Sequence, residues 1–148
     1  MFVISEEFYE IISKKIFELR GVAQYGQVEE PQHSQCKNRS ALIFILESVL
    51  HLHRQAHATH WSPLEGRKAL DHLLLHLYKW PLSEIRALSL ADVILALQDQ
   101  LMPDNLPDEV KSVLKSYGAL SARQLFTDIK DEEWDPDLYL TTPKQQNW

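Results

Sequence analysis

Four of the seven histidines in this 148-residue chain lie within ten positions of one another, in the stretch HLHRQAHATHW. On a helix, at 100° per residue, His53, His57 and His60 would fall within about 60° of one another. A second pair, His72 and His76, follows in the string HLLLH. Its i,i+4 spacing allows two imidazoles to bind one metal ion. These histidines are the first residues whose types and spacing could do chemistry.

A helical hairpin would bring the two pairs together and make a metal site of His53, His57, His72 and His76. A divalent metal ion is therefore the only cofactor that the sequence suggests. The H-E-x-x-H string that usually accompanies such chemistry is absent, and so is the pair of E-x-x-H strings that is typical of di-iron bundles. Histidines near the C-terminal end of a helix also interact favourably with the helix dipole. We therefore expect a structural role and no cofactor, with a metal-binding protein or hydrolase as the alternative.

Other catalytic motifs are missing. The chain has no G-x-x-x-x-G-K-[ST], G-x-G-x-x-G or G-x-S-x-G string, so we expect neither a phosphate loop nor a nucleophile elbow. Cys36 is the only cysteine, which excludes an internal disulfide and favours a reducing compartment. Lys37 and Arg39 flank Cys36 and are expected to lower its pKa and make it an accessible labelling site. These features favour a protein that is not an enzyme.

The segment from residue 128 to the C-terminus is acidic and carries large aromatic residues. Acidic side chains around an exposed aromatic residue can dock onto a basic protein, with the aromatic ring as anchor and the acids steering the approach. In the other interpretation, two of the aromatic rings hold the segment against the helical body while the acids face solvent; both can hold together. The predicted partner-binding residues are Asp128, Asp131, Glu132, Glu133, Trp134, Asp135, Asp137 and Tyr139.

Composition limits the class of protein. The apolar fraction is 45% and the charged fraction 24%, values that are ordinary for a globular chain of one domain, here residues 1–148. A net charge of −6 argues against a nucleic-acid binder, which usually presents a basic face. No signal peptide and no run of 18 apolar residues stands out, so we expect a cytoplasmic protein that does not enter a membrane.

Hydrophobic periodicity and helix caps predict an all-α fold, a compact bundle of about five to seven helices. Ser62, Pro63 and Glu65 form a capping signature, and the helix that follows is expected to be the central, most buried one. The string LIFIL offers more apolar surface than one helix stripe needs, which makes a homodimer possible. The predicted helices are 6–20, 41–58, 63–78, 82–87, 90–101, 107–117 and 121–130, with a long loop at 21–39 and an acidic segment at 128–148.

These observations lead to one functional expectation and two alternatives. We expect a non-enzymatic protein that binds a basic protein partner, of the inhibitor, immunity or adaptor type. The first alternative is the metal-binding protein or hydrolase that uses the clustered histidines. The second is a small regulatory nucleic-acid binder, because residues 82–100 have the outline of a helix-turn-helix. That segment offers Gln98 and Gln100 but no basic residue on its second helix, which disfavours the second alternative.

Overall fold

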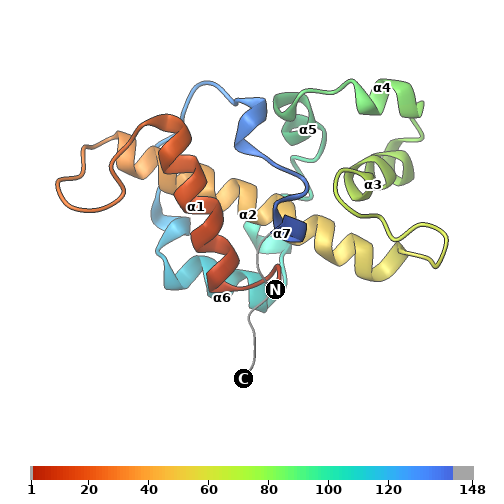
Figure 1. The fold of residues 1–148 in the computed structure, drawn as a ribbon, viewed down its shortest axis with the longest axis horizontal. Helices are drawn as coiled ribbons and strands as arrows, with labels where there is room; N and C mark the ends of the chain where they lie inside the picture. Colours follow the sequence, from red (N-terminus) through yellow and green to blue (C-terminus); the bar gives the residue numbers. More distant parts are fainter. Residues whose placement is uncertain (1, 142–148) are drawn as a thin grey trace.

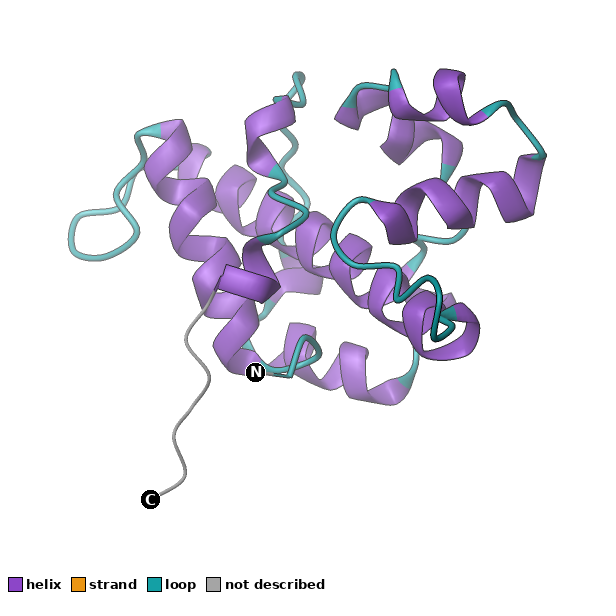
Figure 2. Cartoon of the chain, turned by 45° about the vertical axis from the view of Figure 1, so that its right-hand side comes forward, coloured by secondary structure: helices purple, strands orange, loops and turns teal. Residues whose placement is uncertain are grey.

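The computed structural model describes residues 2–141, which form helices and loops without a β-strand in that range (Figures 1 and 2). The predicted all-α single-domain bundle is confirmed. No helix of the described residues is long and apolar enough to cross a membrane. The α-helices are α1 (Glu6–Arg20), α2 (Gln32–His57), α3 (Lys68–Tyr78), α4 (Leu82–Arg86), α5 (Leu90–Ala96), α6 (Asp108–Ser116) and α7 (Leu138–Thr141), and three short 3-10 helices are η1 (Pro103–Asn105), η2 (Ala119–Ser121) and η3 (Asp131–Glu133).

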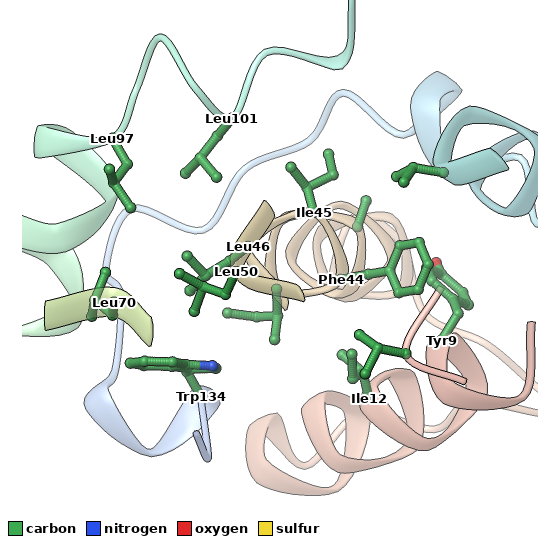
Figure 3. Close-up of a cluster of buried hydrophobic side chains, with 14 of the residues drawn as sticks. Tyr9, Ile12, Phe44, Ile45, Leu46, Leu50, Leu70, Leu97, Leu101 and Trp134 are labelled. Carbon is green, nitrogen blue, oxygen red and sulfur yellow. The ribbon is translucent and has the colours of Figure 1, made fainter. Parts of the chain in front are cut away.

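Helix α1 forms where its sequence predicts. The Ser5 hydroxyl accepts a hydrogen bond from the backbone N–H of Phe8, and Gly21 ends the helix with φ of +65°, a value that glycine adopts without strain. Phe8, Ile12 and Ile16 follow one another at helical spacing and are almost fully buried. This apolar face packs against α2, as the side chains of Figure 3 show.

Helix α2 is the central element, and its 26 residues run through the middle of the molecule (Figure 1). The predicted start at residue 41, after a loop at 21–39, is wrong, because the helix begins at Gln32. The expectation that α3 is the most buried helix is also wrong, because α2 takes that place. Ser40 stands directly before the predicted start at residue 41, yet its hydroxyl does not cap a helix and donates to the carbonyl of Cys36 one turn earlier. Serine can satisfy its hydroxyl inside a helix in this way, so it does not mark a helix start by itself.

Helix α3 begins at Lys68, so the capping signature at residue 62 does not start it. The chain between α2 and α3 instead follows long-range contacts. Leu64 is buried with φ of +59°, and its carbonyl accepts a hydrogen bond from Nε of Arg54 at 2.8 Å. Gly66 also has a positive φ of +59°, and its N–H donates to the Tyr139 hydroxyl. Tertiary hydrogen bonds thus override the local helix signal.

Two further predictions need correction after α4, which matches its prediction closely. Helix α5 ends at Ala96, and the chain continues to residue 101 in turns. The predicted helix at 121–130 is absent, because this stretch is held by α2 in a non-helical conformation. Asn38 and Gln35 of α2 donate side-chain hydrogen bonds to the carbonyls of Ala122 and Leu125. A continuing helix would have used those carbonyls for its own ladder.

Candidate functional site

The end of α2 and the length of α3 bring four histidines together. His53 and His57 lie one turn apart at the end of α2, and His72 and His76 lie one turn apart on α3. The six distances between their ring centroids range from 4.5 to 6.3 Å. We call these four residues the histidine cluster. The sequence had suggested this juxtaposition, and the i,i+4 spacing on both helices produces it.

A direct hydrogen bond joins the two helices inside the histidine cluster. His53 Nε2 and His72 Nδ1 are 2.8 Å apart, so one of these nitrogens carries the proton and the other accepts it. His53 is buried, whereas His57 and His76 are exposed. Burial, followed by the charges of the neighbouring imidazoles, lowers the pKa of His53 to about 4, and burial also lowers the pKa of His72. Both rings are therefore neutral at neutral pH.

The side chains of the histidine cluster, as they stand, do not form a metal coordination site. In the described part of the chain, no three histidine, cysteine, aspartate or glutamate side chains are set to hold an ion as they stand. His60 was expected to share the stripe of His53 and His57, which is wrong because α2 ends at His57 and Ala58 takes an extended conformation. His60 instead contacts the exposed ring of Trp61.

The acidic segment crosses the body of the protein, and we call residues 128–141 the C-terminal strap (Figure 1). Its main attachment is Glu133, which is buried although it was predicted to face a partner. The Glu133 carboxylate accepts hydrogen bonds from Arg20 of α1 at 2.7 Å and from Arg39 of α2 at 2.8 and 2.9 Å. The backbone N–H of Lys130 donates to the same carboxylate. Glu133 thus supplies a buried negative charge to two largely buried guanidinium groups, of which Arg20 also pairs with Asp128.

Trp134 is also inside the molecule, with 7% of its surface exposed (Figure 3). Its indole N–H donates to the Glu47 carboxylate, so in this conformation it anchors the strap and does not present an aromatic ring to a partner. Tyr139 holds the same strap, since its ring lies 4.3 Å below the Arg54 guanidinium carbon and its hydroxyl accepts from Gly66. Trp134 and Tyr139 therefore hold the strap against the helical body, as the second interpretation of the acidic segment predicted.

The other acids of the C-terminal strap remain at the surface to different degrees. Asp128 pairs with Arg20 at 2.9 Å, and Asp135 lies 3.7 Å from Lys15. Asp131 accepts a hydrogen bond from the first backbone N–H of α5, and Glu132 and Asp137 are exposed. Hydrogen bonding to Arg20 lowers the pKa of Asp128. Part of the predicted acidic surface is thus already used by cations of the same chain.

Between α1 and η3 the strap leaves a groove of about 310 Å³. We call it the α1–η3 groove. Its floor includes Ile16 and the half-exposed Leu19, and its rim carries the exposed carboxylates of Glu18 and Glu132. Lys15 and Glu133 complete the lining. Sequence reasoning missed Glu18 and Leu19, because nothing in the sequence indicates that α1 would lie beside the strap.

The structure also shows the surroundings of Cys36 and of the segment at residues 82–100. Cys36 is buried in α2, and burial raises the pKa of its thiol to about 11, so the expected accessible, acidified thiol is wrong. The segment expected to resemble a helix-turn-helix forms α4 and α5, of five and seven residues, with Asp92 and Asp99 exposed. Exposed carboxylates there disfavour contact with phosphates.

Comparison with known proteins finds no matching family, curated protein or solved structure. The fold and the site therefore define the protein only by class: an all-helical domain with a histidine cluster between two helices and an acidic strap across its body.

Proposed function

We propose that the protein works by binding a basic protein partner, as an inhibitor, immunity-type or adaptor protein, and that it docks through the α1–η3 groove. The observation that carries this proposal is the combination of an apolar floor at Ile16 and Leu19 with two exposed carboxylates, Glu18 and Glu132, on the rim. The exposed Asp131 on the same strap extends the negative surface, whereas Asp128 is already paired with Arg20.

This chemistry suits an arginine or lysine side chain of the partner. Such side chains lay their aliphatic stems on apolar surface and keep the charged end at a polar rim. Leu19 is 39% exposed, so it offers contact area that the chain itself leaves uncovered. Lys15 also lines the groove, but its contact with Asp135 offsets part of its charge. The net charge of −6 further favours approach of a basic partner.

Charge reversal tests the proposal. The double variant Glu18→Lys/Glu132→Lys changes two exposed side chains and should leave the fold intact. Proteins recovered with the tagged wild type and with the variant, from cells of the source organism, are compared by quantitative mass spectrometry. We expect a basic protein to be recovered at equal stoichiometry with the wild type and to be depleted about tenfold or more with the variant, since each lost ion pair at an interface weakens binding.

The matched control is Glu84→Lys/Asp99→Lys, which reverses two exposed carboxylates on the α4–α5 side. It carries the same net charge as the groove variant, so a non-specific electrostatic effect would appear in both. Equal loss in the two variants, or no loss in either, would remove the α1–η3 groove as the docking site.

A further inference from the structure

The histidine cluster supports a second site, on different residues from the α1–η3 groove and independent of it. We propose that His53, His57, His72 and His76 bind one divalent transition-metal ion of the zinc, nickel or copper type, and that this ion links α2 to α3. The proposal stands on the positions of four rings, on the kind of donor atoms present, and on access from solvent.

The separations of the four ring centroids are those of rings that share a tetrahedral ion. Zinc binds imidazole nitrogen at about 2.0–2.1 Å, which puts each ring centroid about 3.2 Å from the ion and two centroids about 5.2 Å apart. The six centroid distances in the histidine cluster lie on both sides of that value, from 4.5 Å for His53–His57 to 6.3 Å for His53–His76. The two helices thus bring the ring centroids within about 1 Å of the separation that a shared ion requires.

The rings must turn before they can share an ion, since as they stand no three of the described side chains are set to hold one. Two nitrogens bound to the same tetrahedral ion lie about 3.3 Å apart. His53 Nε2 and His72 Nδ1 are 2.8 Å apart, because a proton and not a metal ion joins them. Rotation of the two rings would open this pair by about 0.5 Å. The imidazole that donates the proton then carries it on its other ring nitrogen, so the change is one of tautomer and releases no proton.

The donor set determines the class of ion. Four imidazole ligands favour zinc, nickel, copper(II) or cobalt, and they disfavour magnesium and calcium, which take oxygen ligands. Arg54 and Lys79 add positive charge near His53 and His72, which weakens the affinity relative to an isolated set of four imidazoles. Because four side chains would complete the shell, the ion would be structural and not catalytic.

Solvent access and the connection between the two helices also favour an ion at this position. His57 and His76 are exposed, so an ion can reach the cluster without unfolding the protein, while buried His53 shields the inner side. The ligands come from two helices joined by the irregular chain 58–67. An ion that binds both helices in the folded state stabilises this pair, because the unfolded chain holds no such set of ligands in place.

The experiment titrates tag-free, chelator-treated full-length protein with Zn²⁺, and separately with Ni²⁺ and Mg²⁺, by calorimetry. The test variant is His57→Asn/His76→Asn, which removes two exposed ligands and spares the buried His53. The matched control is His51→Asn/His60→Asn, which removes two histidines outside the cluster. We expect one Zn²⁺ per chain for wild type and control, binding at least about 100-fold weaker in the test variant, and no comparable binding of Mg²⁺.

Spectroscopy of the wild type and thermal unfolding of wild type and test variant give two further readouts. Nitrogen-15 NMR of the histidine side chains reports which ring nitrogens bind the ion. The extended fine structure of the zinc X-ray absorption spectrum should show four nitrogen neighbours at about 2.0–2.1 Å. Saturating Zn²⁺ should also raise the wild-type Tm by about 5 °C or more and leave the Tm of the test variant unchanged. Shifts at His33, His51 or His60 in place of the cluster, or equal Zn²⁺ affinity in all three proteins, would overturn the proposal.

Discussion

At the scale of single residues, the most unusual group is Glu47, a carboxyl that is 1% exposed in the middle of α2. It accepts the indole N–H of Trp134, while its second oxygen has no hydrogen-bond partner among the described residues. Burial raises the pKa of Glu47 to about 7, and the hydrogen bond from Trp134 and the charge of Arg54 offset only part of that effect. Asp135 and Asp137 of the strap also oppose the carboxylate.

Because of this raised pKa, the ionisation of Glu47 lowers the stability of the folded protein as the pH rises. The folded-state pKa lies above the ordinary value near 4.5, so the stabilisation is complete below pH 4.5 and is lost as the pH rises through about 7. Glu47→Gln cannot ionise and keeps an acceptor for Trp134. The free energy of unfolding of the variant, relative to wild type, should therefore rise by about 3 kcal/mol between pH 4 and pH 8. Urea unfolding at several pH values measures it, and a pH-independent difference would contradict it.

At the scale of elements, prediction from the sequence succeeded where local interactions decide the outcome. Helix α1 needs only its Ser5 cap, its apolar stripe and Gly21, and all three can be recognised without the fold. Helix α3 carries an equally clear start signal at residue 62, but Arg54 and Tyr139 hold the preceding chain in another conformation. The alignment within each i,i+4 histidine pair was predictable in the same way as α1, because helix geometry alone produces it.

The burial of the C-terminal strap, in contrast, is decided by long-range contacts that the sequence does not reveal. Acidic composition suggested a solvated surface, and no local pattern shows that Glu133 would meet Arg20 and Arg39 from helices about a hundred residues earlier in the chain. Such a pairing is long-range and depends on the whole packing arrangement. It also makes the strap a test of how much one buried carboxylate contributes to the fold.

Glu133→Gln should be strongly destabilising, because it removes the buried counter-charge of Arg39 and leaves Arg20 with only the exposed carboxylate of Asp128. Breaking a buried ion pair from one side costs about 3–5 kcal/mol. We expect a loss of about 3 kcal/mol or more in the free energy of unfolding, measured by urea denaturation. Glu132→Gln is the matched control at the exposed neighbouring position, where the change should stay within about 0.5 kcal/mol. Similar small effects at both positions would show that the guanidinium groups find other partners.

At the scale of the whole molecule, α2 is enclosed on several sides by elements from both ends of the chain. Helix α1 packs along its first half, α3 lies beside its end, and the strap covers the region between (Figures 1 and 3). This enclosure explains why a helix with apolar residues in every direction remains inside one chain. It also removes the reason for which the string LIFIL suggested a homodimer, since Ile43, Phe44, Ile45 and Leu46 are all buried within the protein itself.

We therefore expect a monomer of 17.2 kDa in the absence of added metal. Sedimentation equilibrium should give that mass at micromolar concentrations, and the Tm should not change over a hundredfold range of protein concentration, because only an associating protein gains stability by mass action. Leu95 is 68% exposed, and Trp80 and Tyr78, stacked on each other, are partly exposed beside it at the ends of α3 and α5. A concentration-dependent Tm would contradict the monomer and direct attention to that apolar surface, where Leu95→Ser should then abolish the dependence.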